Sequence, residues 1–164
     1  MENCLDAFRS YVHEIGEKLK IENLDLDEEN NCYLAFDGKY FVKCSINGEK
    51  EQLNFLAYIG ALPADETRYY LGLLESNYFW KDTAGANLSL DPEDGTLLLT
   101  QYCNMNMLDS ELFYKTLEKF VNAMEHWDTK RLEEWNESPE KEGDASGSAP
   151  AMGSDQPGMM MFGA

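Results

Sequence analysis

The sequence is short of positive charge. Thirteen lysines and arginines stand against 31 aspartates and glutamates, which gives a formal net charge of −18. Such a surface repels phosphate backbones and anionic headgroups, so we expect neither nucleic acid nor membrane insertion. No apolar run approaches the roughly 20 residues that span a bilayer, and MENCLDAFRSYV lacks the basic start and apolar core of a secretion signal. A soluble, cytoplasmic protein is expected.

Metal-ligating and redox side chains are also scarce. The four cysteines, at positions 4, 32, 44 and 103, share no CxxC or CxH spacing, which excludes the usual zinc and redox motifs. The two histidines, His13 and His126, have no cysteine or histidine at the helical spacings i+3 or i+4. Cys32 and Cys44 fall in strand-like runs, where we expect them to behave as small apolar residues.

Catalytic motifs are missing as well. The sequence contains no GxSxG, GxxxxGK[ST] or GxGxxG pattern. Two pairs of carboxylates, Asp25 with Asp27 and Asp91 with Asp94, would serve acid–base chemistry only if burial drove their pKa values apart. Both pairs lie in segments that resemble solvated turns. We therefore expect no catalytic residues, no metal and no cofactor, and the protein is not expected to be an enzyme.

What the chain does have is enough apolar material for one domain, with 43% hydrophobic and 12% aromatic residues in 164. In the first 20 residues the apolar side chains step by three and four, which predicts an amphipathic helix. These side chains are Leu5, Phe8, Val12, Ile15 and Leu19.

Three strands are predicted next, over residues 32–37, 39–46 and 51–60. Asp37-Gly38 and Asn47-Gly48 separate them, and both dipeptides favour tight hairpins. The sequence therefore predicts a three-stranded meander.

A second helix is predicted from Pro63, which suits a first helical turn, to near Trp80. Two further strands, 88–91 and 96–103, flank the turn sequence PEDG. Asp109 is the expected N-cap of a third helix, whose apolar stripe can be followed to Trp135. The order α-β-β-β-α-β-β-α predicts a two-layer α+β domain with an antiparallel sheet.

The composition changes near Ser138. We place the domain at residues 1–137 and a disordered Gly-, Ser-, Pro- and Met-rich tail at 138–164. The sequence MMMFGA at 159–164 is open to two interpretations, a short adhesive motif or an inert segment, and the inert one is favoured.

The second predicted helix carries more apolar surface than a helix on one sheet requires. Tyr69, Tyr70, Leu73, Phe79 and Trp80 widen its apolar face. One explanation is a deeply buried helix. The other is contact with a second copy of the chain, since homodimers are common and aromatic residues anchor such interfaces.

Two longer runs carry a resemblance to a known family. LDLDEENNCYLAFDGKYF and LLESNYFWKDTAGANLSLDPEDGTLLL resemble the class I type III secretion chaperones, the CesT/Tir-chaperone family, and the resemblance covers roughly residues 3–135. It implies a small, acidic, homodimeric protein of the bacterial cytoplasm that uses no ATP of its own. It also implies an interface on the second helix and the strand after it, formed by Leu71, Leu74, Tyr78, Trp80, Leu88 and Leu90.

The same resemblance implies partners. Such chaperones bind a segment near the N-terminus of one or more secreted effectors, keep it extended and soluble, and deliver it to secretion-apparatus components such as the ATPase. For client binding we nominate the first helix and the edge of the first three strands, with Leu5, Phe8, Val12, Leu34, Phe36 and Phe41, although the same residues also suit a core. The alternative is a regulatory or interaction module resembling the YbjN group, which has a similar fold and no secretion client.

Overall fold

The computed structural model describes residues 2–62, 67–80 and 82–128. Its order of helices and strands is the predicted α-β-β-β-α-β-β-α order. The elements are α1 (Glu2–Leu19), β1 (Asn31–Phe36), β2 (Tyr40–Asn47), β3 (Gln52–Ala61), α2 (Thr67–Asn77), the 3-10 turn η1 (Tyr78–Trp80), β4 (Asn87–Leu90), β5 (Thr96–Asn104), the 3-10 turn η2 (Met105–Met107) and α3 (Ser110–His126). Pro63 and the 138–164 tail lie outside the described residues.

The five strands form one antiparallel sheet in the order β1-β2-β3-β5-β4. Asp37 and Gly38 both have positive φ, 52° and 65°, as a type I′ turn between β1 and β2 requires. The predicted tight turn at Asn47-Gly48 is longer than expected. It runs over residues 48–51, and Asn47 closes it by accepting a hydrogen bond from the backbone N–H of Lys50 at 3.1 Å.

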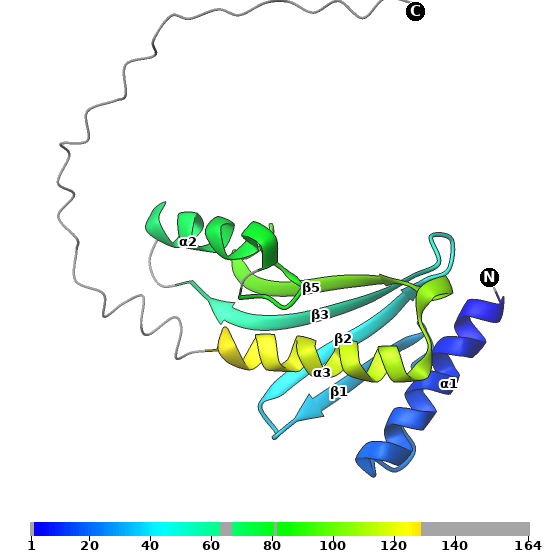
Figure 1. Cartoon of the computed structure of the whole chain (residues 1–164). Helices are drawn as coiled ribbons and strands as arrows, with labels where there is room; N and C mark the ends of the chain where they lie inside the picture. The colour runs from blue at the N-terminus through cyan, green and yellow to red at the C-terminus, as the bar shows by residue number, and fades with distance from the viewer. Residues whose placement is uncertain (1, 63–66, 81, 129–164) are drawn as a thin grey trace, which may run out of the picture.

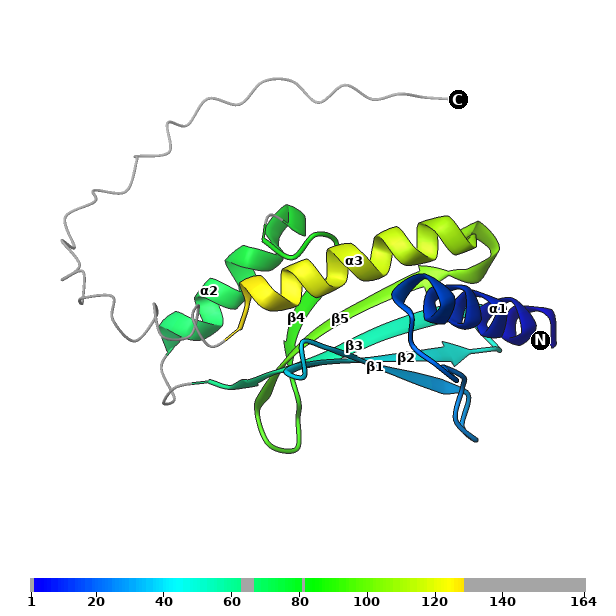
Figure 2. The ribbon, with the colours of Figure 1, turned by 90° about the horizontal axis from the view of Figure 1, so that it is seen from below.

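The sheet is covered on one face only. Figures 1 and 2 show α1 and α3 together on that face, with α2 beyond them beside β4. The opposite face carries no helix in the described part of the chain. This two-layer α+β architecture confirms the predicted fold class.

The core lies between the helices and the covered face. Phe55 of β3 stacks on Phe113 of α3, with ring centroids 5.8 Å apart, and contacts Phe120 at 5.6 Å. Trp127 is fully buried just after α3, and its indole N–H donates to the carbonyl of Asp82 at 2.8 Å. This hydrogen bond ties the end of α3 to the loop before β4.

The N-terminus of α3 is as predicted. Asp109 is the N-cap, and its carboxylate accepts a hydrogen bond from the backbone N–H of Leu112 at 2.7 Å. The helix ends at His126, and Trp135 lies outside the described residues.

The end of α2 differs from the prediction. The helix stops at Asn77 rather than near Trp80, and Phe79 and Trp80 adopt φ of 52° and 51°. Left-handed backbone is costly for bulky residues, so the surrounding structure must hold it. The side-chain amide of Asn77 explains part of this change of direction, because it is bonded to both the N–H and the carbonyl of Leu88, at 2.8 and 3.0 Å, and so fixes the helix end against β4.

Candidate functional site

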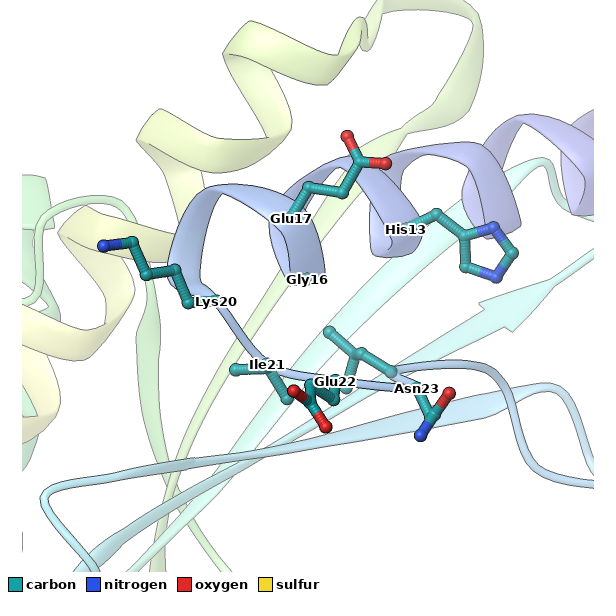
Figure 3. A pocket seen from close by; sticks show the side chains of 8 residues that line it. His13, Gly16, Glu17, Lys20, Ile21, Glu22 and Asn23 are labelled. Carbon is teal, nitrogen blue, oxygen red and sulfur yellow. The ribbon is translucent and has the colours of Figure 1, made fainter.

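One surface hollow lies beside the C-terminal end of α1. It encloses about 470 Å³ and is lined by His13, Gly16, Glu17, Lys20, Ile21, Glu22, Asn23 and Leu24. Figure 3 shows the charged side chains of Glu17 and Lys20 and the His13 ring pointing in different directions. A catalytic site needs convergent groups, so this hollow offers no reaction.

The carboxylates near this end of α1 support the same conclusion. Asp25 lies 3.4 Å from both His13 Nε2 and Arg9 Nε, and a hydrogen bond from the backbone N–H of Leu26, together with these neighbours, lowers its pKa. The turn acid Asp94 also has a lowered pKa, because Thr96 donates hydrogen bonds to it. Carboxylates held ionised in this way are poor general acids.

Asp27 provides a pH-dependent prediction. Its carboxylate accepts hydrogen bonds from the backbone N–H groups of Asn31 at 2.7 Å and Glu29 at 2.9 Å, and the Asn31 bond is the main cause of its lowered pKa. Folding therefore favours the ionised form. The resulting stability is present above the ordinary pKa of 3.8 and is lost as the pH falls through the lower native value.

We expect Asp27→Asn to lower the urea midpoint at pH 6, and the difference from the wild type to shrink at pH 3. Glu28→Gln, which removes the same charge from the same loop, is the matched control. An Asp27→Asn difference of equal size at both pH values would show that the charge of Asp27 is not involved.

The cysteines behave as predicted for small apolar residues. Cys32 and Cys44 face each other across β1 and β2, and both are buried. Burial raises the pKa of the Cys32 thiol to about 11, so almost no reactive thiolate forms at neutral pH. No cluster of three metal-ligating side chains occurs within residues 2–62, 67–80 and 82–128. None of the described helices is long and apolar enough to cross a membrane.

Surplus apolar surface is concentrated on α2 and η1. We call the six exposed large apolar side chains there the α2 patch, namely Tyr70, Leu71, Leu74, Tyr78, Phe79 and Trp80. Leu74 is 67% exposed and Phe79 is 76% exposed. So many exposed large apolar side chains within eleven consecutive residues are typical of an interaction site.

The patch contains four of the six residues nominated for a dimer interface. The other two behave differently, because Leu88 is buried in the core and Leu90 is partly buried against it. Any dimer contact here therefore involves Leu71, Leu74, Tyr78 and Trp80, with β4 as their support.

The residues nominated for client binding are divided between core and surface. Phe8, Val12 and Leu34 are at most 2% exposed, because they belong to the core between the helices and the sheet, so a client cannot reach them without opening the core. Leu5 and Phe36 are half-buried, and Phe41 is 63% exposed on the helix-free face. The structure therefore does not bring the six side chains together on one surface.

The outer edge of β1 has free backbone groups. The N–H of Asn31 donates to the Asp27 carboxylate at 2.7 Å and its carbonyl accepts from the N–H of Asp27 at 2.8 Å, so both point away from β2. Because this orientation alternates along a strand, the N–H and C=O groups of Tyr33 and Ala35 point the same way. Within the described chain these four groups have no backbone partner. We call them the β1 edge.

At the end of the β1 edge lies an apolar hollow of about 160 Å³. It is formed by α1, the last residue of β1 and α3, and is lined by Leu19, Phe36, Tyr114, Leu117, Glu118, Val121 and Asn122. We call it the apolar hollow. Its volume suits one large apolar side chain, since a similar cavity in another protein holds benzene.

Sequence reasoning placed four lining residues on apolar faces of separate elements, but it did not bring them together as one hollow, and it missed Tyr114. The four are Leu19, Phe36, Leu117 and Val121. Leu117 and Val121 belong to the apolar stripe of the third helix, which is typical of ordinary core. It also missed three exposed tyrosines on the helix-free face, Tyr33, Tyr58 and Tyr102. Side chains alternate between the two faces of a strand, and this alternation could have indicated which face these tyrosines occupy.

Charge is almost absent from the sheet. Among the residues of the five strands, Lys43 is the one charged side chain, although 27% of the whole chain is charged. The acidic residues thus lie in helices and loops, and a polypeptide can approach the β1 edge without meeting strand carboxylates.

Comparison with known proteins gives a family. The model described as the Tir chaperone protein (CesT) family matches residues 10–128. Protein CPj0713/CpB0740 of Chlamydia pneumoniae is 29% identical over 106 residues, which cover 63% of this chain and 79% of that protein. The Tir chaperone of Escherichia coli O157:H7 is 23% identical over 115 residues, covering 70% and 73%.

Solved structures share the fold. The chaperone–effector complex HopA1–SchA matches with a TM-score of 0.65 and 17% identity, covering 77% of this chain and 96% of that one. The ExsC–ExsE complex matches with a TM-score of 0.64 and 23% identity, covering 73% and 89%. The type III secretion chaperone SycH of Yersinia pestis, in complex with a fragment of YscM2, matches with a TM-score of 0.58 and 20% identity, covering 74% and 99%.

Proposed function

Because the chain belongs to the Tir chaperone protein (CesT) family, whose members are secretion chaperones and not enzymes, we propose that it binds secreted effectors of a type III secretion system. It binds a segment near the effector's N-terminus, in the bacterial cytoplasm, and keeps that segment extended and soluble. The observation that carries this proposal is the β1 edge, which leads directly into the apolar hollow.

The edge provides the main-chain part of the recognition. An extended client segment that pairs with β1 forms hydrogen bonds with the N–H and C=O groups of Tyr33 and Ala35. The opposite edge of the sheet is less accessible at one point, because the Asn77 amide already occupies the N–H and carbonyl of Leu88 on β4. Strand addition is therefore directed to β1.

The hollow provides the side-chain part. A client strand that runs along Tyr33 and Ala35 reaches Phe36, which lines the hollow. One large apolar client side chain buried there contributes about 1.5–3 kcal/mol. Phe36 thus remains in the proposed client site, together with Leu19 and Tyr114.

One such site is too weak on its own. Ordering five client residues costs roughly 5–10 kcal/mol of backbone entropy at about 1–2 kcal/mol each. Four main-chain hydrogen bonds, at about 0.5–1.5 kcal/mol each, and one buried side chain offset only part of this cost. A homodimer joined through the α2 patch presents two such sites, and a client that engages both gains from their high effective concentration.

Delivery completes the proposed function. The dimer presents the bound client to secretion-apparatus components, including the ATPase. The charge of −18 keeps the complex soluble and repels nucleic acid and anionic membrane.

Co-purification from the native cell tests the proposal. The tagged full chain should retain one or a few abundant secreted proteins, and deletion of the N-terminal region of such a protein should abolish its retention. Clients retained equally well without that region, or recovery of only folded regulatory proteins, would contradict it.

A further inference from the structure

The apolar hollow also has a candidate occupant within this chain. We infer that residues 159–162, Met-Met-Met-Phe, dock into the apolar hollow and compete there with the client. The inference rests on the proposed function for its competition step, whereas the docking itself does not depend on a client.

The first observation is where the described chain ends. Asp128 follows α3, and its carboxylate accepts a hydrogen bond from the hydroxyl of Tyr40 at 2.8 Å and forms an ion pair with Lys39. Tyr40 is the direct partner of Phe36 across β1 and β2. Adjacent strands lie about 4.8 Å apart, so Asp128, the last described residue, is one strand and one tyrosine side chain away from Phe36 at the hollow.

The second observation is the length of chain beyond that point. Residues 129–158 separate Asp128 from Met159, and a chain of about 30 residues can span up to roughly 100 Å. Reach therefore does not limit docking. Tethering raises the effective concentration of the apolar residues at the hollow to about the millimolar range.

The third observation is the match between hollow and segment. Two aromatic rings, Phe36 and Tyr114, line the hollow, and methionine sulfur makes favourable contacts with such rings. The volume of about 160 Å³ accepts one methionine or phenylalanine side chain.

Charge selects residues 159–162 over Trp135, and their four consecutive large apolar side chains select them over the single Met152. Glu118 lies at the rim of the hollow. Trp135 is flanked by Glu133, Glu134 and Glu137, which that carboxylate repels, whereas residues 156–164 carry no charged side chain.

Methyl NMR spectra of the full chain test the docking. We expect the triple substitution Met160→Ser, Met161→Ser and Phe162→Ser to shift the methyl signals of Leu19, Leu117 and Val121 and to leave those of Leu71 and Leu74 unchanged. Trp135→Ser and Met152→Ser are the controls and should shift none of the three. A synthetic peptide of residues 156–164, added to the triple variant, should restore the original positions.

Other outcomes overturn the inference. Unchanged signals in the triple variant would show that residues 159–162 do not occupy the hollow, and shifts caused by Trp135→Ser alone would assign the hollow to that side chain. A segment docked within its own chain has an effective concentration of about 1 mM at any dilution, so its signals should not move between about 500 and 20 μM. Wild-type signals that do move would indicate that the segment of a second copy occupies the hollow.

Competition is measured separately, with an effector segment retained in the co-purification. If residues 159–162 occupy the hollow three-quarters of the time, the triple variant should bind the effector segment about fourfold more tightly than the wild type does. Docking without a change in affinity would overturn the competition step. Failure to find any client would overturn the proposed function and leave the docking result intact.

Discussion

Leu74→Asp combined with Trp80→Ala should convert the proposed dimer to a monomer at about 20 μM. Both side chains are more than half exposed in the α2 patch, and each occurs twice in a symmetric interface. Anchor residues of this kind contribute about 2 kcal/mol or more each. Two such residues in each of two subunits sum to about 8 kcal/mol. Even half of this sum, about 4 kcal/mol, weakens association roughly a thousandfold. Light scattering coupled to size exclusion gives the mass directly.

A matched control is available on the opposite side of the sheet. Tyr58 and Tyr102 are 62% and 65% exposed on the helix-free face, so Tyr58→Asp with Tyr102→Ala makes an equivalent change there. This variant should remain dimeric. A dimer that survives the Leu74 and Trp80 changes, with circular dichroism unchanged in both variants, would disprove the interface assignment.

Ala35→Pro should weaken client binding by about tenfold or more without unfolding the domain. Proline removes the N–H of Ala35, which points away from β2, and edge strands tolerate proline at such positions. A client strand then loses one main-chain hydrogen bond and keeps an unsatisfied carbonyl, which costs about 1–3 kcal/mol. Titration calorimetry with an effector segment measures the change.

Ala35→Thr is the control for this prediction, because threonine suits an exposed strand position and retains the backbone N–H. It should bind the client as the wild type does. Equal affinities for the Pro and Thr variants would rule out pairing at this point of the β1 edge.

The fold was largely predictable because its signals are local. Alternating apolar residues give the strands, and Asp37-Gly38 supplies the two positive φ values that its turn needs. Asp109 stands where the side chain can reach the third backbone N–H of the next helix. Each signal acts over a few residues, so tertiary packing did not override it.

The site was less predictable because it depends on contacts between distant elements. Periodicity shows that Phe8 and Val12 are apolar, but not that α3 covers them. The hollow unites Leu19, Phe36 and Tyr114 from three elements, and no spacing in the sequence connects them. The left-handed turn at Phe79 and Trp80 likewise comes just after Asn77, whose side chain is bonded to Leu88, eleven residues further along the chain.

Amide hydrogen exchange of the protein with and without a bound effector segment tests the central claim most directly. Strand addition to β1 predicts that the amide hydrogens of Tyr33 and Ala35, which face away from β2, become strongly protected when the segment binds. The Ala35→Pro variant has no amide hydrogen at position 35, and its Tyr33 amide should gain less protection than that of the wild type when the segment is added. Protection confined to the α2 patch or to the helix-free face, with Tyr33 and Ala35 exchanging as fast as before, would contradict the account.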